Sequence, residues 1–152
     1  MQMKRSDDDS PLPFFFVSRT IEAMRYLGID YGVKRIGVAV SDDDGAIAFP
    51  GGVLENKGTP AAIRAIIALA KKEKASAIVI GLPIAMSQED TEQTRITRDF
   101  IAKLEKKITV PVMAASEVLT THSARESATR SGHHDASAAA LILQGYLDAC
   151  KN

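Results

Sequence analysis

The chain is poor in cysteine, aromatic residues and net charge, and each shortage argues against a class of protein. Its one cysteine, Cys150, cannot form an internal disulfide and has no Cys or His at metal-ligand spacing, which fits a reduced, cytoplasmic setting. There is no tryptophan and only 5% aromatic residues, which argues against a platform for stacking single-stranded bases. The net charge is zero, so no overall basic field indicates a nucleic-acid partner.

Long apolar runs are also absent. No segment approaches the roughly 18 apolar residues of a membrane helix, so we expect no membrane association. The first 23 residues combine an acidic run with a Phe triplet, a poor match to a signal peptide. We expect residues 1–23 to be a flexible extension or the product of a start codon placed before a natural start at Met24. Residues 24–152 are expected to form one domain, the default at this length.

From Met24 onward, strand patterns and helix patterns follow each other regularly. Strands are predicted at about 25–31, 35–41, 47–54, 77–80 and 110–115. Helices are predicted to begin at the caps Thr59 and Asp135 and at about Thr91, with a short further helix ending near Arg130. The inner face of the second helix is predicted to carry Ile96, Phe100, Ile101 and Leu104. Three strands followed by alternating helices and strands predict an α/β fold with one mixed sheet flanked by helices.

An aspartate at the end of a buried strand is the first candidate functional residue. Asp30 closes the first apolar run, although strands are depleted in Asp and an unpaired buried carboxylate is costly. A metal ion or a substrate would stabilise it there. The alternative is a turn aspartate that caps its own backbone near Gly32, and this segment alone leaves both interpretations open.

Two further carboxylates come from other predicted elements. Glu117 follows the fifth strand, and Asp135 opens the last helix. Ligands usually lie at the carboxyl ends of strands in such sheets, and Mg²⁺ needs only a few carboxylate ligands. Metal ions held in this way can activate the water that attacks a phosphodiester. Because the sequence lacks zinc-peptidase, serine-hydrolase and P-loop motifs, acid-only chemistry on a phosphate ester is the favoured enzyme hypothesis.

Each candidate residue also has a purely structural interpretation. Asp135 is a good helix cap, and Glu117 could be an ordinary surface acid. Either Thr120 or Thr121 could cap the following helix. His133 and His134 are typical turn residues, although their position beside Asp135 suits proton transfer or a phosphate contact.

Taken together, these residues resemble the YqgF/RuvX family, described as pre-16S rRNA nucleases or Holliday-junction-resolvase-like proteins. The resemblance spans about residues 24–149 and rests on segments 28–42 and 79–83, on Glu117 with 119–121, and on Asp135 with 138–139 and 143–147. It implies an RNase H-like fold, a five-stranded mixed sheet with its first three strands antiparallel. It also implies a nuclease whose Mg²⁺ or Mn²⁺ is held by Asp30, Glu117 and Asp135.

The resemblance further implies the partners. The substrate would be structured RNA, above all pre-16S rRNA whose 5′ end is processed in ribosome biogenesis, or branched DNA such as a Holliday junction. The ribosome is a further expected partner, and the protein would be a monomer or a homodimer. The residues expected to contact nucleic acid are Lys34, Arg35, Thr120, Thr121, His133 and His134. Phosphate contacts of this kind position a nucleic acid without distinguishing RNA from DNA, so both substrates stay open.

Two departures from the family pattern keep other functions open. Ser116 and Val118 stand where the family carries an acid and an arginine, and the loop before Asp135 is shorter than usual. A nucleic-acid or ribosome-binding module that kept the fold and lost catalysis is therefore an alternative. An ATPase of the actin and sugar-kinase type also places a Gly-x-Asp-x-Gly turn after its first strand. That type needs two such domains, which 152 residues do not supply.

Overall fold

A five-stranded mixed sheet, in the order β4-β3-β2-β5-β6, forms the centre of the molecule. The computed structural model describes residues 24–84, 89–116 and 134–151. The strands are β2 (Tyr26–Tyr31), β3 (Arg35–Ser41), β4 (Ala48–Glu55), β5 (Ala77–Leu82) and β6 (Val112–Ser116). β2, β3 and β4 pair antiparallel, whereas β5 runs parallel to both β2 and β6. The predicted fold class and the antiparallel first three strands are confirmed.

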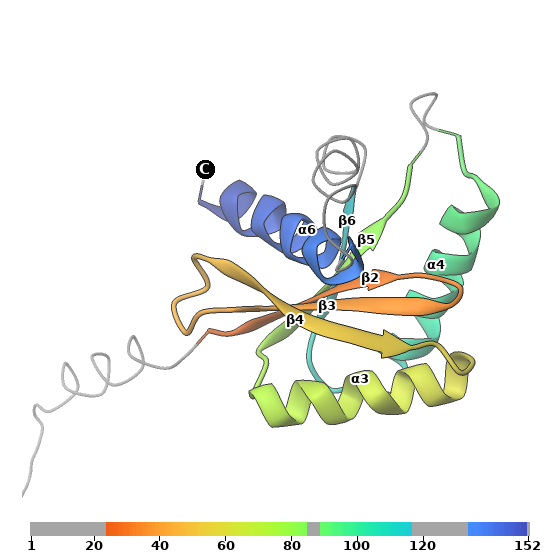
Figure 1. The fold of residues 1–152 in the computed structure, drawn as a ribbon, viewed down its shortest axis with the longest axis horizontal. Helices are drawn as coiled ribbons and strands as arrows, with labels where there is room; N and C mark the ends of the chain where they lie inside the picture. The colour runs from red at the N-terminus through yellow and green to blue at the C-terminus, as the bar shows by residue number, and fades with distance from the viewer. Residues whose placement is uncertain (1–23, 85–88, 117–133, 152) are drawn as a thin grey trace, which may run out of the picture.

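Helices cover both faces of this sheet (Figure 1). One face carries α3 (Thr59–Glu73) and α4 (Glu92–Glu105), and the other carries α6 (His134–Cys150). β5 is an inner strand between β2 and β6 and is buried along its whole length, as its continuous apolar run predicted. No helix in the described part of the chain is both long and apolar enough to cross a membrane.

The alternation of side chains along β2 and β3 divides the core into two unequal halves. Large side chains such as Leu27, Ile29 and Ile36 point towards α3 and α4. In that half, the ring of Tyr31 stacks on Phe100 of α4, with centroids 4.0 Å apart. In the half under α6, the strands supply smaller residues such as Ala39 and Val79, and α6 packs Leu143 and other side chains on them.

The start of α3 and the inner face of α4 differ from the prediction. Thr59 is not a cap, because it already lies in α3 and the preceding Gly58 occupies the cap position. Thr91 does cap α4, in a reciprocal capping box with Thr94. Thr94 then donates its hydroxyl hydrogen to the Pro83 carbonyl, and this bond turns Thr94 inward.

Two threonines of α4 therefore face the core. Thr94 and Thr97 are fully buried, whereas Ile96 is 37% exposed, so the predicted inward position of Ile96 is wrong. Phe100 and Leu104 are buried as predicted, and the partly buried Ile101 packs on the same core. The predicted helix ending near Arg130 lies outside the described residues.

Candidate active site

Two glycines allow α6 to lie directly on the sheet. A Cβ atom on Gly37 would lie 1.9 Å from the backbone carbonyl oxygen of Asp135. A Cβ atom on Gly28 would lie 2.8 Å from Cβ of Leu143. Since Gly37 is the cross-strand partner of Asp30 in the β2–β3 ladder, this close approach brings the first turn of α6 beside Asp30.

Asp30 is a strand residue that faces α6. It lies within β2, two residues after Gly28, so its side chain leaves the same face of the sheet. The turn that follows is closed by Asn56, whose side-chain amide donates to the Gly32 carbonyl at 2.7 Å. The structure therefore places Asp30 inside the strand, and Asn56 holds the turn that follows.

The pKa of Asp30 is raised from 3.8 to about 6. Burial of its carboxyl group is the larger cause, and the negative charge of Asp135 is the smaller one. Asp135 lies in the first turn of α6, which begins at His134, so the predicted capping role of Asp135 is wrong. Its carboxylate instead forms an ion pair with Arg35 of β3. Two acids from distant parts of the sequence thus share one negative site.

Arg35 completes the described part of this site. Its Nε lies 3.0 Å from Oδ2 of Asp135, and its side chain is 68% exposed. An exposed pair of this kind is weak and can exchange partners with solvent ions or a phosphate. Lys34 lies beside it in the exposed turn between β2 and β3. The structure thus brings Asp30, Asp135 and Arg35 together at one edge of the sheet.

The structure does not describe the remaining predicted site residues. Glu117, Thr120, Thr121 and His133 lie outside the described residues, as does the side chain of His134. β6 ends at Ser116, directly before Glu117, and Ser116 pairs with the last residue of β5. Sequence reasoning missed Gly37, although a glycine inside an apolar strand often marks close backbone approach.

The chemistry of this carboxylate pair fits a divalent cation. Carboxylate oxygens are the ligands that Mg²⁺ prefers, and Mn²⁺ takes the same hard donors. Asp135 raises the pKa of Asp30, so the two negative charges repel each other, and a cation between them would relieve this. Among the described residues, no group of three His, Cys, Asp or Glu side chains could hold a metal. Glu117, the third predicted ligand, lies outside the described residues.

Comparison with known proteins points to one family. The family described as "Holliday junction resolvase", RuvX, matches residues 24–149. A relative from Nitratidesulfovibrio vulgaris is 37% identical over 133 residues, which cover 82% of this chain and 94% of the relative. One from Rickettsia rickettsii is 36% identical over 134 residues, covering 83% and 87%. Both carry the name "Putative pre-16S rRNA nuclease".

Among solved structures, the fold resembles that of Thermus thermophilus RuvC in complex with a Holliday junction substrate. The TM-score is 0.57 at 16% identity, with 85% of this chain and 96% of the other covered. Fold and relatives together define the class of the protein as a nuclease, a hydrolase of phosphodiester bonds. More particularly, the chain belongs to the RuvX family. This membership decides against the ATPase alternative.

Proposed function

We propose that the protein is a divalent-metal-dependent nuclease that processes the 5′ end of pre-16S rRNA during ribosome biogenesis. Asp30, Glu117 and Asp135 would hold Mg²⁺ or Mn²⁺. The observation that carries the proposal is the pair of Asp30 and Asp135, close enough for one charge to raise the pKa of the other. The substrate is inferred from the names of the relatives.

The metal would supply an activated water and a positive charge opposite the phosphate oxygens. The chain's own residues prepare the site for it. Asp30, with its pKa of about 6, is mostly ionised at neutral pH and is then able to bind a cation. Arg35 holds the Asp135 carboxylate by its exposed ion pair and can turn to a phosphate when the substrate arrives. Lys34 adds a second cation on the same approach.

The other predicted contacts complete the proposal. Thr120, Thr121, His133 and His134 would bind the substrate backbone, and the ribosome would present the rRNA. We further propose that residues 24–152 act as one nuclease domain in the cytoplasm, as a monomer or a homodimer. Residues 1–23 would be a flexible extension or lie upstream of the natural start.

Cleavage of a Holliday junction is the second candidate activity. It is favoured by the description of the family and by the likeness of the fold to RuvC. A binding module without catalysis is the third candidate, motivated by Ser116 and Val118.

A cleavage assay separates these candidates. The wild-type chain and Asp30→Asn are incubated with a pre-16S rRNA fragment or a four-way DNA junction, with Mg²⁺, Mn²⁺ or EDTA. We expect metal-dependent cleavage of the rRNA fragment, lowered at least about a hundredfold by Asp30→Asn because a ligand is lost. The matched control is Asp44→Asn, which removes an exposed aspartate in the β3–β4 turn. Undiminished metal-dependent cleavage by Asp30→Asn would exclude the proposed site. RNA binding without cleavage by the wild-type chain would favour the binding module.

A further inference from the structure

A groove lined by lysines runs along the seam between α3 and the end of α4. Two cavities of about 330 and 370 Å³ form this groove, and they share Lys107. Their linings extend from Thr59 and Pro60 at one end of α3 to Lys74 at its other end. The lining residues are all described, and none of them is acidic. The lysines of this α3–α4 groove are Lys71, Lys74, Lys103, Lys106 and Lys107.

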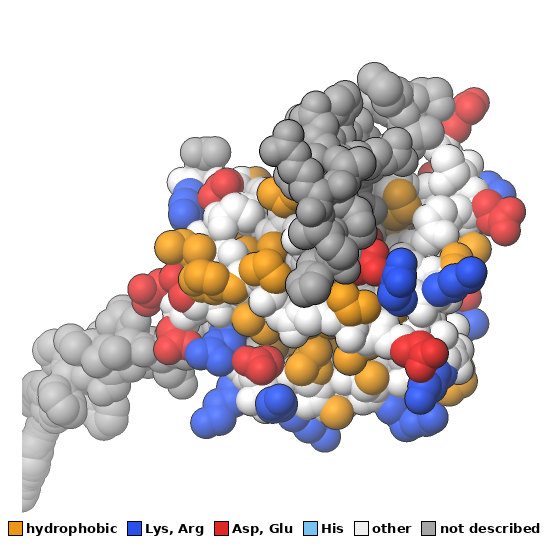
Figure 2. Space-filling view, in the orientation of Figure 1, with side chains coloured by type: hydrophobic (Ala, Val, Ile, Leu, Met, Phe, Trp, Pro, Cys, Tyr) orange, Lys and Arg blue, Asp and Glu red, His pale blue; other side chains and the backbone are white. Residues whose placement is uncertain are grey.

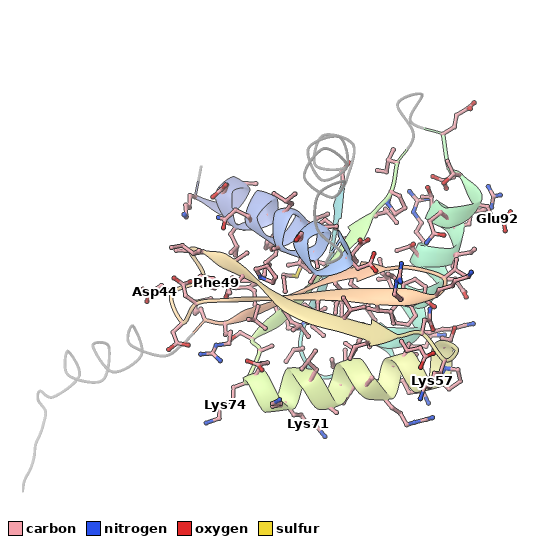
Figure 3. The ribbon with its side chains drawn as sticks, in the orientation of Figure 1. Asp44, Phe49, Lys57, Lys71, Lys74 and Glu92 are labelled. Atoms are coloured by element: carbon pink, nitrogen blue, oxygen red, sulfur yellow. The ribbon has the colours of Figure 1, made fainter. Side chains whose placement is uncertain are left out.

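The positive charge of the groove is largely unbalanced. Only Lys103 takes part in an ion pair within the described part of the chain, with Asp99 at 3.0 Å. All five lysines are exposed. Figure 2 shows basic side chains along the lower side of the molecule, and Figure 3 shows Lys71 and Lys74 projecting from α3 away from the sheet. In a chain of zero net charge, this is a local concentration of cations.

The floor of the groove is apolar, and it is half-buried at Ile67, Ile108 and Val110 but buried elsewhere. Ile63 and Ala70 are each 6% exposed, and Ala75 is 8% exposed. The aliphatic stems of lysines commonly cover such seams while their ammonium groups stay in water. The five ammonium groups lie around this floor with no acidic residue in the lining, and this charge favours a polyanion as the partner.

The lining contains no aromatic side chain, so stacked bases are not the expected contact. Phosphates need only the lysines and are bound regardless of base sequence. α3 has 15 residues. At about 1.5 Å per residue, a helix of that length matches roughly six base-pair steps of 3.4 Å.

The groove lies on the face of the sheet opposite the candidate active site. Asp30 and Asp135 are on the α6 side, whereas the lysines belong to the α3 and α4 layer. A straight duplex bound at Asp30 would therefore leave the groove empty. A branched or folded RNA can send a second arm around the sheet to reach it.

We propose that the α3–α4 groove binds the sugar–phosphate backbone of a second arm of a folded RNA whose cleavage site lies at Asp30 and Asp135. The proposal rests on the proposed function for its choice of RNA. The five lysines would then select substrates by their shape, because only a substrate with two arms in suitable places gains their contacts.

The test is RNA binding without divalent metal, so that it does not depend on cleavage. The probes are a three-way RNA junction and a straight RNA duplex of equal length, titrated at several salt concentrations. Lys71→Gln with Lys107→Gln is compared with Lys57→Gln with Lys151→Gln, which removes two exposed lysines outside the groove. For the junction, we expect the groove variant to lower the salt slope by about 0.7–0.9 per lysine and the affinity by about tenfold at low salt. The control variant should show little change, and the groove variant should lose clearly less on the straight duplex than on the junction.

Three outcomes would overturn the inference. One is an equal slope for the groove variant and the control variant on the junction. Another is an equal loss on the straight duplex, which would indicate a general field effect. The third is an unchanged RNA slope with lost binding of a poly-glutamate peptide, which would assign the groove to an acidic protein. This test does not measure cleavage. If the groove lysines contribute to the salt slope but the chain cuts neither RNA nor DNA, the proposed function is contradicted and this inference stands.

Discussion

The face of the sheet under α3 and α4 is packed with large side chains, whereas the face under α6 is built from small ones. On the first face, Phe100, Ile66 and Leu104 are at most 1% exposed and contact one another through a continuous core. On the second, Gly28 and Gly37 let the helix backbone approach the strands directly. The first face can supply most of the hydrophobic stabilisation, while the second gives up side-chain volume.

The small residues on the α6 face allow the two acids to come together. Gly37 has no Cβ, so the first turn of α6 lies against β3 and Asp135 comes close to Asp30. The ionised Asp30 is then held in a half-buried site beside a like charge, which opposes folding. The comparison teaches that one face stabilises the domain, whereas the other holds the proposed site at some cost in stability.

The largest expected effect on stability lies on the α3–α4 face. Phe100→Ala removes a fully buried ring that stacks on Tyr31, so we expect the free energy of unfolding to fall by about 3–5 kcal/mol. Urea unfolding followed by circular dichroism measures it. Ile96→Ala, on the exposed side of the same helix, serves as control and should cost less than about 1 kcal/mol. A similar loss for both would contradict the burial of this face.

The next effect concerns the close approach of α6. Gly37→Ala places a methyl group against backbone that cannot move alone, so we expect a loss of about 3 kcal/mol. Gly51→Ala, in the edge strand β4, meets only the Val38 side chain and neighbouring backbone at 3.3 Å or more and should cost about 1 kcal/mol or less. Equal losses in the same urea experiment would refute the proposed role of Gly37.

Much of the fold followed from sequence patterns, for identifiable reasons. β5 was predictable because its run from Ala77 is continuously apolar, and β2–β3 because two apolar runs flank a short turn. The inner face of α4 was not, because a hydroxyl bond from Thr94 to Pro83 sets its rotation and hydrophobic period says nothing about such bonds. Asp30 could be selected as a candidate because aspartate is rare inside a strand, and its role in the site stays a prediction. Its pairing with Asp135 depends on Gly37, a contact across the chain that no local pattern encodes.

A smaller effect is the dependence of stability on pH. The pKa of Asp30 is raised to about 6 in the folded chain, so its favourable contribution is present below about pH 4 and is lost as the pH rises through 6. Asp30→Asn should therefore be more stable than the wild-type chain above pH 6, by about 1–3 kcal/mol after allowance for solvent screening. Urea unfolding between pH 4 and 8 should show the difference vanishing at the acidic end. A gain that persists unchanged at pH 4 would disprove the assignment to this carboxyl.

The smallest expected effect concerns Arg35. Because its guanidinium competes for the Asp135 carboxylate through an exposed ion pair, Arg35→Gln should tighten Mg²⁺ binding by up to about fivefold. Calorimetric titration of Mg²⁺ measures the change, and Lys34→Gln, which lies one residue away, is the matched control. Unchanged Mg²⁺ affinity in both variants would place the cation away from Asp135.

The central claim is that Asp30 and Asp135 share one divalent cation. NMR titration of the Asp30 carboxyl carbon, with and without saturating Mg²⁺, tests it directly. Without Mg²⁺ we expect a pKa of about 6, and with Mg²⁺ a value lowered by at least about one unit because the cation stabilises the carboxylate. A pKa of Asp30 that Mg²⁺ does not change would contradict the account.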